Sequence, residues 1–379
     1  MTPTEKLLRE LIALPSVNPA FMPAGDPRAG EGRVADFLLA TAASAGLDVE
    51  LRPVFPARPN LLARLTPAGK IRRRVLLAPH MDTVGDVAMS DALFQPRSKN
   101  GRLHGRGACD TKGSVAAMLT ALSAVAKGGP RPAGTEVVFV ALVDEECGQS
   151  GSRALVKKKF PADLAIVGEP TCLRVVTAHK GDLWLMIETR GLAAHGSKPH
   201  LGRNAVHAMA RIVELLETNY AAHLRRRRHP LLGHPTVNVG SIHGGRQPNI
   251  VPDECVISID RRTIPGESNA SVVREIKALL KQHDLTATLL DSKSAAPCPP
   301  LETDPRHPLV KLFLQTAGQS KPSGVDYFSD AAVLASGGIP SVVFGPGDIA
   351  QAHTADEWIS LHSLEHGTAL LTRFLQSLP

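Results

Sequence analysis

The sequence is poor in aromatic residues and cysteine, and it contains no long apolar run. Phe, Trp and Tyr make up 4% of the 379 residues, which gives no support to a groove that stacks nucleic-acid bases. The cysteines are five in number and form no CxxC pair. Such a set favours reduced thiols and a cytoplasmic location. The longest apolar run, near 115–126, is about 12 residues long, which is too short to span a membrane.

Positive charge exceeds negative charge by a modest margin. Lys and Arg number 43 and Asp and Glu number 36, giving a net charge of +7. Part of the excess is the RRRR run at 225–228, which we interpret as a solvated helix end because no aromatic residues interleave with it. The opening MTPTEKLLRE has no apolar signal core. We therefore expect no nucleic-acid or membrane partner, and a basic surface favours small anionic substrates.

Hydrophobic patterning predicts an α/β domain that is interrupted by an insertion. Nearly continuous apolar strands between helical segments indicate a mixed, mostly parallel sheet with helices on both faces. The strands of this domain are expected at 49–54, 60–65, 75–78, 136–143, 163–167 and 340–344. Its helices are expected near the N-terminus and at 31–45, 114–127, 309–317 and 364–375.

The pattern changes near Lys180, where apolar and polar residues begin to alternate. Strands are expected at 183–189, 236–241, 255–259 and 286–290, with helices at 205–219 and 270–283. A Pro/Ala/Ser linker at 294–300 follows. We predict a first catalytic segment at 1–179, an inserted α+β domain at 180–293, and a second catalytic segment at 294–379.

Acidic residues and histidines occur in five short motifs of the larger domain, and three of these motifs follow the end of an expected strand. Because the carboxyl ends of parallel strands form the ligand crevice of such sheets, these side chains are expected to lie close together. The segments are HMD with His80 and Asp82, LHGRGACDTKG with Asp110, DEE with Glu145 and Glu146, VGEPT with Glu169, and AHTADEW with His353. Taken singly, each has a structural explanation: Asp110 can cap the helix that follows it, and His80 can be a core histidine.

Taken together and in this order, the five motifs resemble the di-zinc amidohydrolase and carboxypeptidase family. This family includes acetylornithine deacetylases, succinyl-diaminopimelate desuccinylases, aminoacylases and glutamate-releasing carboxypeptidases. The resemblance spans nearly the whole chain, including the insertion. It implies an enzyme that cleaves the amide bond of an N-acyl amino acid or a short peptide. The segments at 168–173 and 178–181 are closer to acetylornithine deacetylases, and dipeptidase, glutamate carboxypeptidase and desuccinylase activities remain alternatives.

The resemblance also implies a role for each motif residue. His80, Asp110 and Glu169 would bind one divalent metal ion, and Asp110, Glu146 and His353 would bind a second. Asp82 would orient the imidazole of His80, and Glu145 would be the general base. Two histidines and three carboxylates suit Zn²⁺ best, and Co²⁺ or Mn²⁺ also accept such ligands.

The insertion carries further candidates by the same resemblance. His195, in GLAAHGSKP, would donate a hydrogen bond to the developing oxyanion, from its own chain or from the partner of a homodimer formed through the insertion. Asn249 and Arg262 match positions that bind substrate, and a guanidinium suits a carboxylate. Arg261 is the alternative to Arg262, because neighbouring strand residues face opposite ways. Gly324, in SGVDYFSD, matches a substrate loop.

Overall fold

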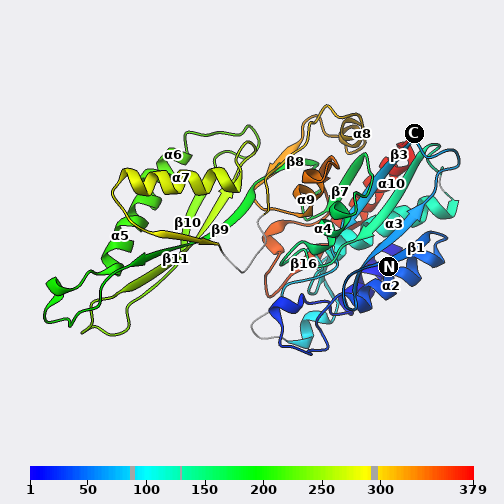
Figure 1. Ribbon diagram of the computed structural model, residues 1–379. Helices are drawn as coiled ribbons and strands as arrows, with labels where there is room; N and C mark the ends of the chain where they lie inside the picture. Colours follow the sequence, from blue (N-terminus) through cyan, green and yellow to red (C-terminus); the bar gives the residue numbers. More distant parts are fainter. Residues whose placement is uncertain (86–89, 129, 292–297) are drawn as a thin grey trace. The chain divides into compact units, whose positions relative to one another are not determined.

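The computed structural model describes residues 1–85, 90–128, 130–291 and 298–379, and these form two compact units (Figure 1). The first unit comprises Met1–Thr177, Thr303–Ser323 and Ser329–Pro379, so the blue and red ends of the chain both belong to it. The second comprises Ala178–Glu302 and Gly324–Phe328. The insertion expected at 180–293 falls within the longer of these two ranges. Of the linker expected at 294–300, residues 294–297 lie outside the described residues.

The largest sheet of the described residues has nine strands and a parallel centre. Strands β6, β3, β7 and β15 run parallel, whereas β1 and β2 on one side and β8 and β13 on the other pair antiparallel. The order is β1 (Asp48–Phe55), β2 (Arg58–Leu65), β6 (Thr135–Ala141), β3 (Arg73–Pro79), β7 (Leu164–Gly168), β15 (Ser341–Val343), β8 (Val176–His179) and β13 (Leu301–Glu302), with β14 (Ser323–Val325) paired to β8. The predicted α/β class is confirmed.

Helices cover both faces of this sheet, as the burial of alternate strand residues requires. Val75 and Leu77 of β3 belong to one hydrophobic cluster, whereas Leu76 and Ala78 are equally buried but point away from it. The helices on the cluster face are α1 (Pro3–Ile12), α2 (Gly32–Ser44), α3 (Lys112–Gly128), α8 (Pro308–Thr316) and α10 (Leu361–Ser377). Helices α4 (Ser150–Lys157) and α9 (Asp330–Ser336) pack together, and α9 contacts β7 and β15. None of the described helices is both long and apolar enough to cross a membrane.

Local signals explain where the helices next to the site begin. Thr2 caps α1, because its Oγ1 accepts the backbone N–H of Glu5 at 3.1 Å. Helix α3 begins at Lys112, two residues before the expected start, and the ammonium group of Lys112 is fully buried. Its Nζ donates to the carbonyls of Leu11 at 2.9 Å and Leu14 at 2.7 Å. The helix that follows Asp110 is therefore anchored to the end of α1.

A small sheet, too short to be predicted, completes the first unit. Its order is β16 (Trp358–Ser360), β5 (Arg102–His104) and β4 (Arg97–Lys99). Trp358 lies opposite His104, and Ile359 lies opposite Leu103. The segment that follows His353 is thus paired with the segment that precedes Asp110.

The second unit is an antiparallel sheet with helices on one face. Its strands are β10 (Thr236–Gly244), β11 (Glu254–Thr263), β9 (Gly181–Arg190) and β12 (Thr288–Asp291), in that order. Helices α5 (Ala205–Leu215), α6 (Ala221–Leu224) and α7 (Asn269–Gln282) supply the rest of its hydrophobic cluster. The single helix expected at 205–219 is instead interrupted by a π turn at Leu216–Tyr220. The burial alternates along β11, so the face away from the helices is more exposed.

Candidate metal centre

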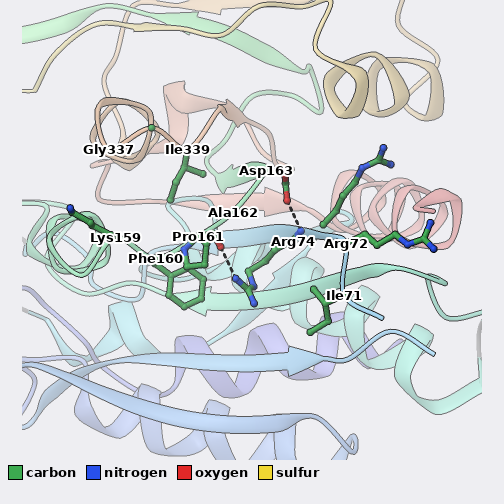
Figure 2. Close-up of a pocket in the computed structure, with 12 residues that line it drawn as sticks. Ile71, Arg72, Arg74, Lys159, Phe160, Pro161, Ala162, Asp163, Gly337 and Ile339 are labelled. Atoms are coloured by element: carbon green, nitrogen blue, oxygen red, sulfur yellow. Dashed lines mark hydrogen bonds between the residues drawn. The ribbon is translucent and has the colours of Figure 1, made fainter. Parts of the chain in front are cut away.

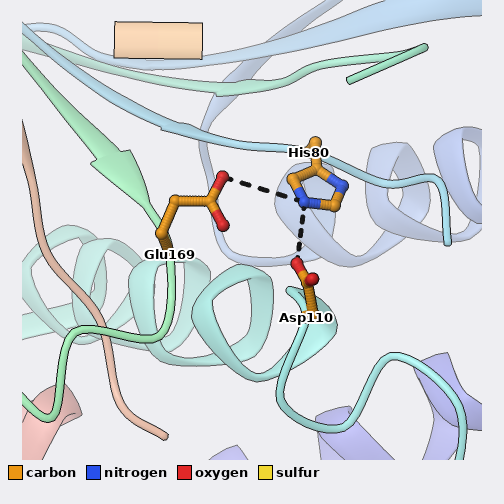
Figure 3. Close-up of side chains that lie close together, drawn as sticks. All are labelled: His80, Asp110 and Glu169. Carbon is orange, nitrogen blue, oxygen red and sulfur yellow. Dashed lines mark hydrogen bonds and ion pairs between the residues drawn. The ribbon is translucent and has the colours of Figure 1, made fainter. Parts of the chain in front are cut away.

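The predicted ligands of the first unit form two groups at the carboxyl ends of the central strands. His80 follows β3 directly, Glu169 follows β7 directly, and Glu145 and Glu146 lie on the loop after β6. One group is His80, Asp110 and Glu169 (Figure 3), and the other is Asp110, Glu146 and His353. In each group, the ligand atoms all lie within 4.8 Å of one another.

Asp110 belongs to both groups and presents a different oxygen to each. Its Oδ1 lies 3.1 Å from Nε2 of His80, and its Oδ2 lies 3.3 Å from Nε2 of His353. Nε2 of His353 also lies 3.1 Å from Oε2 of Glu146, and Nε2 of His80 lies 3.8 Å from Oε1 of Glu169. This is the geometry expected of a carboxylate that is shared between two cations.

The hydrogen bonds of His80 leave Nε2 suitable for binding a cation. Nδ1 faces the backbone carbonyl of Asp82 at 3.0 Å and Oδ1 of the same residue at 3.4 Å. Both are acceptors, so Nδ1 carries a proton and, in the neutral ring, Nε2 presents its lone pair. That lone pair points at an oxygen of Asp110, and the two atoms attract only if a proton or a metal ion lies between them.

The electrostatics of the metal-free cluster reflect this requirement for a cation. Burial alone lowers the pKa of His80, but its contacts with Asp110 and Asp82 outweigh burial and raise that pKa. Contacts with Asp110 and Glu146 raise the pKa of His353 to about 10. Burial raises the pKa of Glu146 to about 7. In the metal-free protein, protons therefore supply the positive charge that the carboxylates need.

Two buried carboxylate oxygens of the cluster are suited to a metal ion. Oε1 of Glu146 and Oε1 of Glu169 accept no hydrogen bond from the described residues. Burial raises the pKa of Glu169, and also that of Glu145, well above the ordinary value of 4.5. A buried carboxylate without a donor is costly, so cation binding is the arrangement that would satisfy these oxygens. The residues present therefore fit two divalent ions.

Asp82 holds the loop that carries Glu145 and Glu146. Its Oδ1 accepts the backbone N–H of Glu145 at 3.1 Å, and its Oδ2 accepts that of Glu146 at 3.1 Å. The amide of Asn18 donates to the same Oδ2 at 2.8 Å. Asp82 therefore positions both His80 and the two adjacent glutamates, which extends the role predicted for it.

The sequence analysis did not identify the residues behind this loop. Asn18 also donates to Oδ1 of Asp144 at 3.0 Å, and Arg58 donates to the same oxygen at 3.2 Å. Arg58 forms a two-bond pair with Glu31, which is fully buried and accepts the backbone N–H of Asp144 at 3.0 Å. The Asn-Pro sequence at 18–19 indicates a turn, but neither it nor the isolated Arg58 reveals these distant partners.

The second unit contains His195 and Asn249 close to each other. The backbone N–H of Gly196 donates to the carbonyl of Asn249 at 2.7 Å. The N–H of Ser197 donates to Nδ1 of His195 at 3.2 Å. A neutral His195 therefore carries its proton on Nε2, and this nitrogen is a hydrogen-bond donor.

The alternation along β11 separates the two arginine candidates. Arg261 is fully buried against Tyr220 and Glu267, so we do not retain it as a substrate contact. Arg262 pairs with Asp260 at 2.9 Å and lies 3.7 Å from Asp182. The partly buried Gly324 lies against the backbone of Leu231, where a Cβ would meet the carbonyl at 2.6 Å.

A hollow of about 590 Å³ lies at the opposite end of the central strands, where β3 and β7 begin (Figure 2). Arg74 is already bound there, through Nη1 to the carbonyl of Pro161 at 3.0 Å and through its backbone N–H to Asp163 at 2.7 Å. The side chains of Arg72, Arg74 and Lys159 point in different directions. We therefore assign no ligand to this hollow.

Comparison with known proteins identifies the family. The profile of peptidase family M20/M25/M40 matches residues 76–377. The chain belongs to this family. It is 33% identical to an acetylornithine deacetylase of Myxococcus xanthus over 321 residues, covering 83% of this chain and 82% of the relative. The family resemblance predicted from the motifs is confirmed, and the protein is a hydrolase of the metallopeptidase type.

Solved structures of metallopeptidases and related enzymes share the fold of the chain, and two of them illustrate the agreement. An aminopeptidase PepT from Bacillus cereus superposes with a TM-score of 0.78 at 22% identity, covering 99% of this chain and 97% of the other. An M20 family metallo-carboxypeptidase, Sso-CP2 from Sulfolobus solfataricus, gives 0.77 at 20% identity, covering 99% of both chains.

The raised pKa values predict that the metal-free protein loses stability as pH increases. The pKa of Glu146 rises from 4.5 to about 7 and that of His353 from 6.5 to about 10. Their contribution is complete below the ordinary values and is lost as pH passes the raised ones. The pKa of Asp110 is lowered because its contacts with the two histidines outweigh burial. Its stabilising contribution is therefore complete above the ordinary value of 3.8, and it adds no pH dependence above that value.

The measurement is thermal unfolding of chelator-treated and zinc-saturated protein between about pH 5 and about pH 9. The metal-free Tm should fall across this range, and the zinc-saturated Tm should fall less because the ions replace the protons. Glu146→Gln, which cannot titrate, should flatten part of the metal-free decline. A metal-free Tm that rises with pH would contradict the assignment.

Proposed function

We propose that the protein hydrolyses the amide bond of N-acyl amino acids in the manner of an acetylornithine deacetylase. The observation that carries the proposal is the pair of histidine–carboxylate groups that share Asp110, with Glu145 close enough to His80, Glu146 and Glu169 for their charges to shift its pKa. The named activity of the Myxococcus relative, 33% identical to this chain, supports the acetyl group. The alternatives on the same scaffold are a dipeptidase, a glutamate carboxypeptidase and a succinyl-diaminopimelate desuccinylase.

Two divalent ions would complete the site. His80, Asp110 and Glu169 would hold one, and Asp110, Glu146 and His353 the other. Zn²⁺ fits this set of nitrogen and carboxylate ligands best, and Co²⁺ or Mn²⁺ also accept it. When bound, such a pair of ions acidifies a water molecule and polarises the scissile carbonyl.

Glu145 would move the proton. It takes one proton from the attacking water and delivers it to the leaving nitrogen, so that the amide yields a carboxylic acid and an amine. Glu146 belongs to a ligand group and Glu145 to neither of the two, which supports separate roles for these neighbouring residues. Burial keeps the pKa of Glu145 high, which favours proton uptake.

His195 would stabilise the oxyanion, and Arg262, Asn249 and Gly324 would contact the substrate. The donor character of Nε2 in His195 supports its role at the oxyanion.

We further propose a homodimer through the second unit, with His195 serving the site of the other subunit. Among the described strands of this unit, β10 is a sheet edge. None of the five cysteines, all of which lie among the described residues, forms a disulfide, and Cys172 is exposed, which supports a reducing, cytoplasmic location.

A panel of substrates tests the proposed activity. The zinc- or cobalt-loaded protein should hydrolyse an N-acetyl amino acid, such as N-acetylornithine, faster than an N-succinyl amino acid or a dipeptide. Masking the α-carboxylate as an amide should lower kcat/KM, because Arg262 would lose its charged partner. Chelator-treated protein is the control. Preference for a dipeptide would replace the deacetylase assignment, and equal rates on acid and amide would remove the role of Arg262.

Neighbouring glutamates should respond differently to the same substitution. Glu145→Gln should retain both metal ions and lower kcat by about 10²- to 10⁴-fold, the usual contribution of a general base. Glu146→Gln should bind fewer metal ions, because it removes a ligand charge. Metal content by elemental analysis and turnover under metal saturation distinguish the two. The reverse pattern would exchange the roles.

Subunit exchange tests the proposed dimer. His195→Ala and Glu145→Gln should each be inactive alone. If His195 acts across the interface, a mixed dimer contains one site with neither substitution, and mixing should restore activity. No recovery after exchange, verified by differently tagged subunits, would place His195 in its own chain's site. A monomer at assay concentration would exclude the arrangement.

A further inference from the structure

Glu357 joins the segment that presents His353 to the loop that presents Asp110. Its carboxylate accepts three backbone N–H groups of that loop: from Gly107 at 2.9 Å, from Cys109 at 2.8 Å and from Asp110 at 3.0 Å. The residue is 3% exposed. The peptide N–H of Asp110 is therefore fixed by a side chain almost 250 residues away in sequence.

Arg106 forms a second link between the same two segments. Its Nη1 donates to Oε2 of Glu357 at 3.0 Å and to the backbone carbonyl of Thr354 at 3.1 Å. Thr354 follows His353 directly, and Arg106 is 2% exposed. The backbone N–H of Gly105 also donates to the carbonyl of Glu357 at 3.0 Å.

Only a carboxylate satisfies this set of contacts. Three N–H groups and one guanidinium converge on two oxygens, and each oxygen accepts two hydrogen bonds. A glutamine at this position would turn an NH₂ group toward donors, because its amide has one acceptor oxygen. Gly107 has a φ of +82°, and a Cβ there would lie 2.8 Å from Lys112 Cδ. Gly107 thus allows the backbone to close around the carboxylate.

We propose that Glu357 is a positioning residue that fixes Asp110 relative to His353, so that one carboxylate can present an oxygen to each metal ion. This inference rests on the proposed two-metal function. It predicts unequal effects on the two ions. Without Glu357, Asp110 and His353 are no longer held in place relative to each other. This disturbs two ligands of the Asp110–Glu146–His353 group, whereas the His80–Asp110–Glu169 group has only Asp110 disturbed.

The test is direct titration of the metal-free protein with Co²⁺, followed by absorption spectroscopy and calorimetry. Glu357→Ala should weaken one of the two ions by about 10- to 100-fold, as loss of a residue that orients a ligand does, and the other ion by less. Glu357→Asp keeps both oxygens and should retain more affinity than Glu357→Gln. This order separates positioning from a general loss of stability.

Glu136→Ala is the matched control. Glu136 is also buried, at 5% exposure, but it pairs with Arg74 where β6 begins, away from the cluster. Its loss should lower the Tm and leave both metal affinities unchanged. If Glu357→Ala does not fold, the comparison of Glu357→Gln with Glu357→Asp decides the question.

The outcomes separate this inference from the proposed function. If Glu357→Ala binds both ions with wild-type affinity, the inference is overturned and the proposed function stays intact. Where the alanine variant does not fold, the same result for Glu357→Gln has the same meaning. A wild-type protein that binds no Co²⁺ would overturn the two-metal function itself. Equal weakening of both ions by Glu357→Ala and by Glu136→Ala would reduce Glu357 to a stability role.

Discussion

The burial of like charges at one edge of the sheet governs the rest of the structure. Asp110, Glu146 and Glu169 are brought together at the ends of the central strands, and Glu145 lies near enough to Glu146 and Glu169 for their charges to raise its pKa. Two unit charges 4 Å apart repel by about 4 kcal/mol even at an effective dielectric constant of about 20. A few such pairs would equal the total stability of a typical domain, which is about 5–15 kcal/mol. The cluster can exist only with protons or metal ions bound, and it must be held by a framework that does not use up the ligand oxygens.

The loops around the cluster meet this requirement because their backbone N–H groups, and the guanidinium of Arg58, donate to acidic residues that are not metal ligands. Asp82 takes the backbone N–H groups of Glu145 and Glu146, and Glu357 takes those of the Asp110 loop. Arg58 is paired with a buried glutamate and with Asp144 rather than with the ligands. Oxygens of the ligand carboxylates therefore face histidines or remain without a hydrogen-bond donor. The acids of the site divide into those that support the backbone and those that face the cluster.

This division explains which parts of the site the sequence could predict. His80 and Glu169 follow nearly continuous apolar strands, so their convergence follows from strand direction. The supporting contacts of Asn18 and Glu357 are formed with residues far away in sequence, and no local pattern encodes them. The three-residue strands that pair around Leu103 and Ile359 are too short to show periodicity. The alternation along β11 left two arginines open, and only the packing of Arg261 against Tyr220 decided between them.

All members of the two ligand groups come from the first unit, although they span the sequence from His80 to His353. Arg262 and Asn249, the proposed substrate contacts, come from the second. Mutations that alter these contacts change no metal ligand and no residue that supports one. Selection can therefore act on the choice of substrate while the catalytic centre stays constant.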